Sequence, residues 1–190
     1  MKTTNIMIVG VGGQGSLLAS KLLGKLLCSE GYDVKVSEVH GMSQRGGSVV
    51  TYVRFGEKVY SPIIDKGEAD YIISFEKLEG ARYVSCLKNN GTLVVNTQQI
   101  DPMPVIIGAA EYPVEILSEI EAKGVNVDKI DALALANTAG SSKAVNIVLL
   151  GRLAKHMDIP TEKWIAAIEN TVKPAFVELN KKAFDLGYNS

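Results

Sequence analysis

Short apolar runs alternate with stretches of helical periodicity at the start of the chain. Residues 6–9 form an uninterrupted apolar run, which is typical of a fully buried strand. Residues 16–29 carry leucines at helical spacing, and Gly31 supplies a C-terminal stop for that helix. Residues 33–39 alternate apolar and polar positions and predict a second strand. Together these segments predict a right-handed βαβ unit whose two strands are parallel.

The pattern from residue 47 onward predicts that antiparallel strands join this parallel unit. Residues 47–55 are rich in β-branched and aromatic side chains, which favours a strand. A short segment at residues 58–60 follows Gly56, so we expect a hairpin that turns at Gly56. The sheet should therefore be mixed. The whole pattern indicates an α/β protein with a Rossmann-like start and a helical C-terminal region.

Further strands and helices follow along the rest of the chain. The helix predicted at residues 142–156 is apolar nearly all round, so it belongs either in the core or against another chain. No internal repeat or linker interrupts the pattern, and we expect one domain over residues 1–190. The other predicted strands cover residues 70–75, 91–96, 105–107 (an edge strand) and 125–131, and the other predicted helices cover 76–86, 114–123 and 162–187.

Composition and charge narrow the possible functions. Of the 190 residues, 46% are apolar, which suffices for a core, and the formal net charge is −1. Because neither sign of charge dominates, nucleic acid and anionic membranes are not expected as partners. No apolar run reaches the length of a membrane span and no signal segment is visible, so we expect a cytoplasmic protein.

The chain has only two cysteines and two histidines. We expect Cys28 and Cys86 to be buried, reduced thiols. Two cysteines cannot supply the four ligands of a four-cysteine iron–sulfur cluster or of a structural zinc site. His40 and His156 do not lie at a metal-ligand spacing. A metal site within this chain is therefore not expected.

A glycine-rich segment joins the first predicted strand to the first predicted helix. It contains Gly10, Gly12, Gly13, Gln14 and Gly15, in the order Gly-Val-Gly-Gly-Gln-Gly. Glycines in a strand–turn–helix context permit a tight turn and a close approach of the backbone to a ligand. The free N–H groups at the start of the helix favour an anion such as a phosphate. These five residues are therefore candidates for binding a phosphate-bearing cofactor.

A second glycine-rich segment, at residues 40–47, follows the second predicted strand. Its Arg45 suits a phosphate or a carboxylate, and Ser43 and Gln44 precede it. We expect these three residues, with Gly46 and Gly47, to lie in the same crevice as the first segment, where strand ends meet helix starts. Arg45 could equally fix its own loop by donating to carbonyl groups.

A nicotinamide dinucleotide is a competing interpretation of the first segment. It requires an acidic residue at the end of the second strand for the ribose hydroxyls, and Glu38 lies there. The chain then enters the second glycine-rich segment instead of an ordinary crossover, and no catalytic set of side chains follows the sheet. An independent NAD(P)-dependent oxidoreductase is therefore kept as the alternative, together with a scaffold subunit that binds no ligand.

The two segments together resemble a known family. The sequence Gly-Val-Gly-Gly-Gln-Gly at residues 10–15 and the sequence Ser-Glu-Val-His-Gly-Met-Ser-Gln-Arg-Gly-Gly-Ser at residues 37–48 resemble the gamma-type subunit of 2-oxoacid:ferredoxin oxidoreductases. The residues around His40 and Met42 are most similar to the beta subunit of indolepyruvate:ferredoxin oxidoreductase. The apolar stretch at 144–151 agrees with this resemblance.

This resemblance implies a three-layer α/β/α fold with a mixed sheet, and it implies a complex. The complex would oxidatively decarboxylate an aryl pyruvate with coenzyme A, giving an acyl-CoA, carbon dioxide and reduced ferredoxin. Thiamine diphosphate and [4Fe-4S] clusters would belong to a large partner subunit, and the chain alone would be inactive. The sequence agrees with this division, because it contains neither a Gly-Asp-Gly motif nor a cysteine cluster.

The resemblance also suggests what this chain contributes. It would help to bind coenzyme A through the two glycine-rich segments, or those segments would pack at the subunit interface. His40 is assigned to an interface or contact role, because no carboxylate or nucleophile lies at a motif spacing from it. Met42 receives the same assignment. No residue of this chain is assigned to catalysis.

Overall fold

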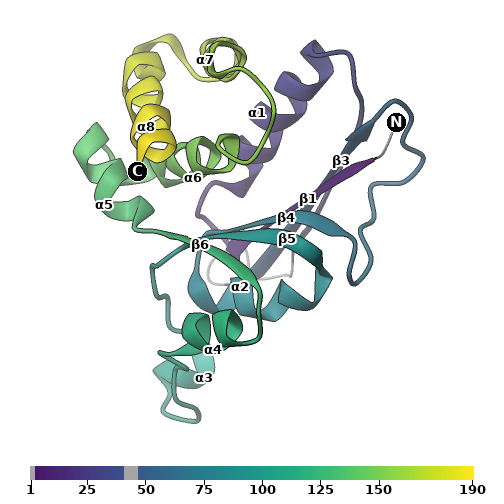
Figure 1. The fold of residues 1–190 in the computed structure, drawn as a ribbon. Helices are drawn as coiled ribbons and strands as arrows, with labels where there is room; N and C mark the ends of the chain where they lie inside the picture. Colours follow the sequence, from purple (N-terminus) through teal and green to yellow (C-terminus); the bar gives the residue numbers. More distant parts are fainter. Residues whose placement is uncertain (1–2, 41–46) are drawn as a thin grey trace.

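A mixed sheet runs through the centre of the molecule (Figure 1). This computed structural model describes residues 3–40 and 47–190, in which the sheet has six strands in the order β2-β3-β1-β4-β5-β6. β3 pairs antiparallel with both β1 and β2, whereas β1, β4, β5 and β6 are parallel. The predicted mixed sheet is confirmed. The strands are β1 (Thr4–Val11), β2 (Asp33–His40), β3 (Ser48–Gly56), β4 (Ala69–Ser74), β5 (Leu87–Asn96) and β6 (Asn126–Ile130).

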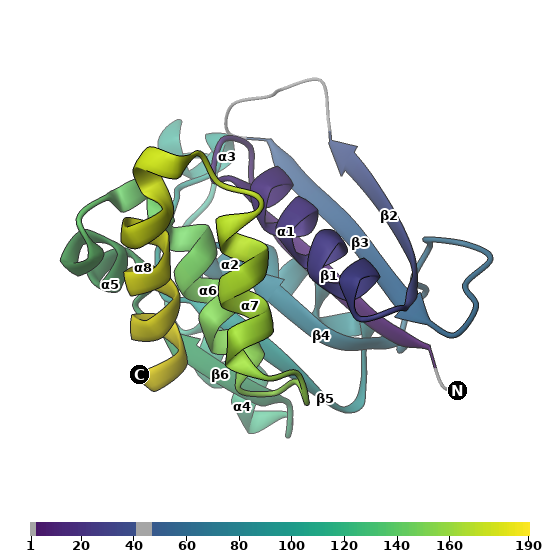
Figure 2. The same ribbon diagram turned by 90° about the horizontal axis from the view of Figure 1, so that it is seen from above.

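Helices cover both faces of the sheet, so the molecule has three layers (Figures 1 and 2). The helices are α1 (Ser16–Ser29), α2 (Lys77–Tyr83), α3 (Met103–Ile106), α4 (Ile116–Ala122), α5 (Ala132–Ala139), α6 (Val145–Ala154), α7 (Thr161–Glu169) and α8 (Val177–Asn189). α1, α5, α6, α7 and α8 lie on one side, and α2 and α4 lie on the other. The α/β/α architecture is thus confirmed.

Alternation along β1 divides the core between the two faces. Ile6 and Ile8 pack with the leucines of α1, whereas Met7 and Val9 pack with residues of β4, β5 and α4. All four side chains are fully buried. A strand buried on both faces reads as a continuous apolar run, which is why residues 6–9 show no period of two.

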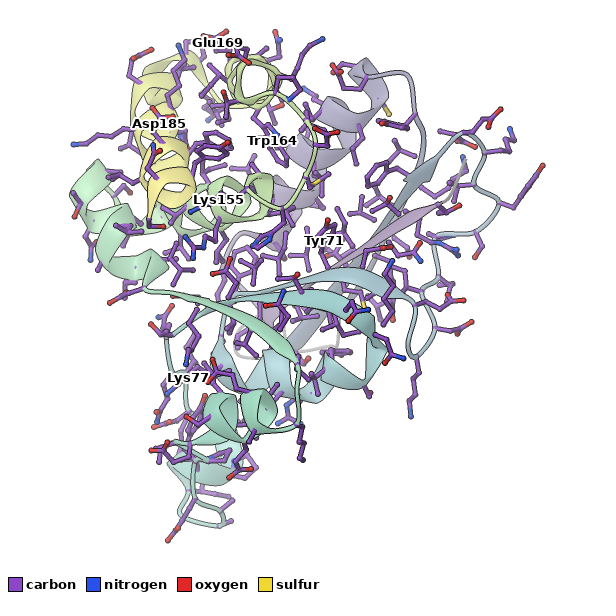
Figure 3. The ribbon with its side chains drawn as sticks, viewed as in Figure 1. Tyr71, Lys77, Lys155, Trp164, Glu169 and Asp185 are labelled. Carbon is purple, nitrogen blue, oxygen red and sulfur yellow. The ribbon has the colours of Figure 1, made fainter. Side chains whose placement is uncertain are left out.

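The apolar helix α6 belongs to the core of this chain, which decides between the two expectations for it. Ile147, Val148 and Leu149 are completely buried in the larger of the two apolar clusters. Trp164 of α7 points into the same layer and stacks on Phe184 with 5.8 Å between ring centroids. Figure 3 shows Trp164 inside this layer, with Glu169 and Asp185 at its outer surface.

The predicted hairpin at Gly56 is wrong. Residues 57–60 form no strand, and β3 instead pairs with β2 on one side and with β1 on the other. Both edges of β3 are therefore occupied, so a strand at 58–60 would have no place beside it. β1 and β2 run in the same direction, as predicted, but β3 separates them.

Two further expectations are corrected. The edge strand predicted at residues 105–107 is wrong, because the short helix α3 starts after Pro102 and has Pro104 in its first turn, where proline is tolerated. Cys28 is exposed and Cys86 is half-buried, so neither is the buried thiol that we expected. Cys28 lies outside the buried leucine stripe of α1.

Candidate functional site

The first glycine-rich segment forms the turn between β1 and α1, at the carboxyl end of β1. Gly13 and Gly15 have φ values of 98° and 89°, in the left-handed region that favours glycine. A β-carbon at Gly10 would lie 2.9 Å from Phe75 Cβ and 2.9 Å from Gln14 Oε1. The turn therefore requires glycine for two different reasons, backbone angle and close packing.

Gln14 braces this turn from inside. Its Oε1 accepts a hydrogen bond from the backbone N–H of Val11 at 2.7 Å, and its Nε2 donates to the carbonyl of Phe75 at 3.2 Å. The carboxamide thereby links the turn after β1 to the end of β4. Gln14 also lines the cleft described below, but its polar atoms already have partners within the chain.

The start of α1 offers backbone donors to a ligand. Glycine occupies the N-cap, so no side chain caps the helix. The N–H groups of Leu18 and Ala19 donate to the carbonyl of Gly15. Among the described residues, no partner is present for the N–H groups of Gly13 and Ser16. Unpaired amides at a helix N-terminus, with the positive end of the helix dipole, favour an anion.

Asn146, at the start of α6, closes the other side of the turn. Its Nδ2 donates to the carbonyl of Gly15 at 3.2 Å, and its side chain is almost fully buried. A β-carbon at Gly15 would lie 2.9 Å from that same nitrogen. The close packing of Gly15 against Asn146 therefore fixes the position of α6 relative to α1.

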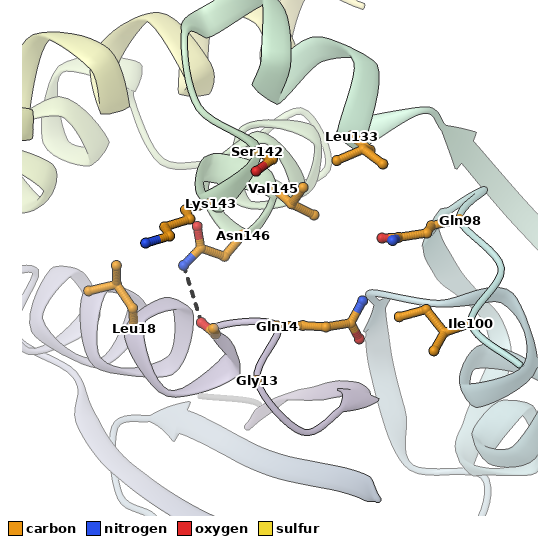
Figure 4. A pocket seen from close by; sticks show the side chains of 11 residues that line it. Gly13, Gln14, Leu18, Gln98, Ile100, Leu133, Ser142, Lys143, Val145 and Asn146 are labelled. Atoms are coloured by element: carbon orange, nitrogen blue, oxygen red, sulfur yellow. Dashed lines mark hydrogen bonds between the residues drawn. The ribbon is translucent and has the colours of Figure 1, made fainter. Parts of the chain in front are cut away.

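A cleft of about 580 Å³ opens where these elements meet (Figure 4). Lys143 is exposed and is the one cationic side chain among the described residues that line the cleft. The walls of the cleft combine the backbone of the glycine turn with apolar and polar side chains from four other segments. The lining residues are Gly13, Gln14, Gly15, Leu18, Gln98, Ile100, Leu133, Ser142, Lys143, Val145 and Asn146.

Two buried carboxylates support this region from the neighbouring α2. Glu76 is 1% exposed and accepts hydrogen bonds from the N–H of Glu79 at 2.9 Å, the N–H of Ile100 at 3.3 Å and the hydroxyl of Tyr112. Burial, together with this contact to Glu76, raises the pKa of Tyr112 well above its ordinary value, so Tyr112 stays a hydrogen-bond donor. Glu79 accepts a hydrogen bond from the hydroxyl of Ser48.

The second glycine-rich segment is only partly described. Gly47 lies beside the first segment, because its carbonyl accepts a hydrogen bond from the N–H of Gly12 at 2.8 Å. The two segments are therefore adjacent at Gly12 and Gly47, whereas the shared crevice stays a prediction. Met42, Ser43, Gln44, Arg45 and Gly46 lie outside the described residues, as does the side chain of His40, so the roles assigned to them remain predictions.

Glu38 does not lie where a dinucleotide fold would place it. The antiparallel strand β3 separates β2 from β1, and the hydroxyl of Thr51 on β3 donates to Glu38 at 3.4 Å. Glu38 is exposed and lines a second hollow of about 340 Å³ with Gly12 and Ser16. A Rossmann site needs the second strand directly beside the first, and this topology does not provide it.

Eight of the eleven residues that line the cleft were not predicted as site residues, among them Gln98, Lys143 and Asn146. Gln98 follows β5, whereas Lys143 and Asn146 precede or begin α6. Asn146 could have been detected in the sequence, because it is a polar residue within an otherwise apolar helical segment. Nothing in the local pattern distinguishes Lys143 or Gln98 from ordinary surface residues.

Comparisons with known proteins extend over nearly the whole chain. Residues 5–190 match the family described as pyruvate ferredoxin/flavodoxin oxidoreductase. The chain is 45% identical to the indolepyruvate oxidoreductase subunit IorB of Pyrococcus horikoshii, with 98% of this chain and 95% of that protein covered. It is 44% identical to the subunit IorB of Thermococcus kodakarensis, with the same coverage of both chains.

Solved structures share the fold at lower sequence identity. The pyruvate oxidoreductase subunit PORC from Thermotoga maritima matches with a TM-score of 0.75 and 22% identity, covering 100% of this chain and 97% of that one. The 2-oxoglutarate:ferredoxin oxidoreductase from Magnetococcus marinus matches with a TM-score of 0.77 and 20% identity, covering 100% of this chain and 31% of that one. In the latter protein, this fold is one part of a longer chain.

Proposed function

Because the chain belongs to the pyruvate ferredoxin/flavodoxin oxidoreductase family and is a subunit of a 2-oxoacid:ferredoxin oxidoreductase complex, we propose that its complex acts on indolepyruvate or a related aryl pyruvate. The product would be the corresponding acyl-CoA. The high identity to two IorB subunits, over almost their full length, supports this substrate class. Neither the topology around Glu38 nor these relatives support the nicotinamide alternative.

The contribution of this chain would be to bind the phosphate-bearing part of coenzyme A in the cleft. The observation that carries this proposal lies at the N-terminus of α1, where the N–H group of Gly13 has no partner among the described residues and the exposed ammonium of Lys143 lines the same cleft. A diphosphate suits such donors, whereas the apolar walls at Leu18, Ile100 and Leu133 suit the less polar parts of the ligand.

The residues of the second glycine-rich segment complete this proposal. Arg45 would supply a further cation at the same crevice, with Ser43 and Gln44 beside it, because the carbonyl of Gly47 is bonded to the N–H of Gly12. Gly10 would act by shaping the turn, because Phe75 and Gln14 leave no space beside it. Gln14 would brace the turn, because its polar atoms already have partners within the chain. His40 and Met42 would contact the partner subunit.

The redox groups would reside on a larger companion subunit. Thiamine diphosphate would supply the carbanion chemistry there, and [4Fe-4S] clusters would supply electron transfer to ferredoxin. This chain has two cysteines, and among the described residues no group of His, Cys, Asp or Glu is placed to hold a metal. None of the described helices combines the length and apolarity needed to cross a bilayer. We propose that the complex works in the cytoplasm.

The test is calorimetric titration of coenzyme A into the reconstituted complex. Lys143→Ala and Arg45→Ala should each weaken binding by about tenfold or more, since a hydrogen bond to a charged group contributes roughly 1.5–3 kcal/mol and tenfold corresponds to about 1.4 kcal/mol. Lys182→Ala, an exposed lysine of α8 away from the cleft, is the matched control and should bind like the wild type. Unchanged affinity in both Lys143→Ala and Arg45→Ala would contradict the proposal that this chain binds coenzyme A.

The substrate assignment needs its own measurement. The reconstituted complex should use indolepyruvate with a higher kcat/KM than pyruvate or 2-oxoglutarate, and the isolated chain should turn over none of them. A complex that prefers 2-oxoglutarate would contradict the aryl pyruvate assignment but would leave the family membership in place.

A further inference from the structure

A protruding segment exposes several large apolar side chains. Residues 101–115, which we call the arm, connect β5 to α4 and contain α3. Met103, Ile106, Ile107 and Val114 are 65%, 66%, 68% and 63% exposed. Figure 1 shows α3 at the lower end of the molecule, beyond α4 and farthest from the C-terminal helices. Exposed apolar residues gathered on one segment mark an interaction surface rather than ordinary scatter.

The arm lies in the most acidic part of the chain. Between Lys88 and Lys123 the sequence has no Lys or Arg but has Asp101, Glu111, Glu115, Glu119 and Glu121. These five acidic residues give −5, and the whole chain carries −1, so the remainder carries +4. Glu121 pairs with Lys129, whereas Glu111, Glu115 and Glu119 are exposed. A complementary surface would therefore be apolar at its centre and basic at its rim.

Hydrogen bonds anchor the arm at both ends and within it. At one end, Ile100 donates its N–H to Glu76, and at the other Tyr112 donates its hydroxyl to the same carboxylate. The N–H of Leu78 donates to the Tyr112 oxygen at 3.2 Å. Within the arm, Val105 donates to the carbonyl of Pro102 at 2.9 Å. A surface ordered before binding loses less conformational entropy when a partner docks.

We propose that the arm docks into an apolar, basic-rimmed groove on the larger companion subunit. This inference rests on the proposed function, which supplies the companion. The companion is favoured over a second copy of this chain, because a symmetric contact through the arm would bring Glu111 and Glu115 of both copies together. In the Magnetococcus marinus protein the same fold covers 31% of a longer chain.

The test measures assembly of the chain with its companion. The double variant Ile106→Gln/Ile107→Gln removes apolar surface without changing charge, and it should bind the companion roughly 30-fold or more weakly, as for a hot spot at an interface centre. Tyr60→Gln is the control, because Tyr60 is 87% exposed and lies outside the arm. It should bind within about twofold of the wild type. Thermal unfolding of each isolated chain verifies that both variants fold.

A second variant tests the charge complementarity independently. Glu111→Lys/Glu115→Lys should weaken binding and reduce its dependence on ionic strength, since exposed charges of opposite sign are screened by salt. Wild-type affinity in the glutamine double variant would overturn the docking proposal and leave the proposed function intact. A wild-type dimer that the glutamine variant abolishes, with companion binding unchanged, would also overturn it. Failure of the wild-type chain to bind any companion would overturn the proposed function as well.

Discussion

The contact between α6 and α8 makes a sharp prediction about stability. Each helix has a buried glycine at the contact, Gly151 in α6 and Gly187 in α8. A β-carbon at Gly151 would lie 2.2 Å from the carbonyl oxygen of Phe184. A β-carbon at Gly187 would lie 2.0 Å from the carbonyl oxygen of Val148. The two backbones are therefore in direct contact, and α6 in turn carries Asn146 to the cleft.

The expected magnitude for Gly151→Ala follows from two opposing effects. Alanine favours a helix by about 1 kcal/mol over glycine. Overpacking a filled interior costs about 1–3 kcal/mol or more, and the upper end applies because the obstacle is helix backbone rather than a movable side chain. The net loss is about 2 kcal/mol, which corresponds to a fall in Tm of roughly 4–8 °C for a chain of this size.

Gly24→Ala provides the matched control with the opposite sign. Gly24 lies inside α1, and its β-carbon would meet only Val36 Cγ2 at 3.7 Å, an ordinary contact. The same helix preference then acts without a clash, so the variant should be up to about 1 kcal/mol more stable than the wild type. Urea denaturation followed by far-UV circular dichroism measures both. Equal or increased stability of Gly151→Ala would refute the close-contact reasoning.

Two further variants probe polar groups that are partly or fully buried, Asp128 and Asn96. Burial alone would raise the pKa of Asp128, but hydrogen bonds from Arg152 and His156 outweigh it and hold that pKa below its ordinary value. The stabilisation is therefore present above the unfolded-state pKa of about 3.9 and is lost as the pH falls through the lower folded-state value. The stability gap between wild type and Asp128→Asn should shrink below about pH 4, and a constant gap in urea titrations from pH 7 to pH 3 would contradict this. Asn96→Ala should cost about 2 kcal/mol or more, because fully buried Asn96 bonds the carbonyl of Phe75 at 3.0 Å and the N–H of Ala132 at 3.1 Å. Asn170→Ala, at an exposed position of a helix end, is its control and should change stability by less than about 0.5 kcal/mol in the same assay.

Local sequence patterns predicted the individual strands and helices better than they predicted the order of the strands in the sheet. β1, α1 and β2 follow from apolar periodicity and from the stop at Gly31, all of which act over a few residues. The placement of β3 between β1 and β2 depends on pairing between strands that are distant in sequence. That is a contact between segments about 40 residues apart, as Met7 with Tyr52, and no periodicity encodes it.

The error at residues 105–107 has a physical origin. Val105, Ile106 and Ile107 are β-branched, and such residues favour strands when they can pack on a sheet. Here Ile106 and Ile107 are largely exposed, so no sheet surface rewards the extended form. The prolines at 102 and 104 instead suit the start of a helical turn.

The candidate site also has a part that the sequence predicts and a part that only the fold brings together. The glycine turn could be predicted because its strand, turn and helix are consecutive in sequence. Lys143 and Asn146 join it from about 130 residues away, through the bond from Asn146 to the carbonyl of Gly15. Only the folded chain reveals that a small polar stretch before an apolar helix forms the opposite wall of the cleft.

The cleft and the arm are both hydrogen-bonded to Glu76. Gln98 and Ile100 line the cleft, and the arm begins at the next residue after Ile100. Glu76 binds Ile100 on the cleft side and Tyr112 within the arm, so one buried carboxylate holds both. The carbonyl of Phe75, its chain neighbour, accepts hydrogen bonds from both Gln14 and Asn96. Hydrogen bonds around residues 75 and 76 therefore connect the arm with the glycine turn. The two sites that we propose, the arm and the cleft, are therefore both bonded to the same short segment at the end of β4.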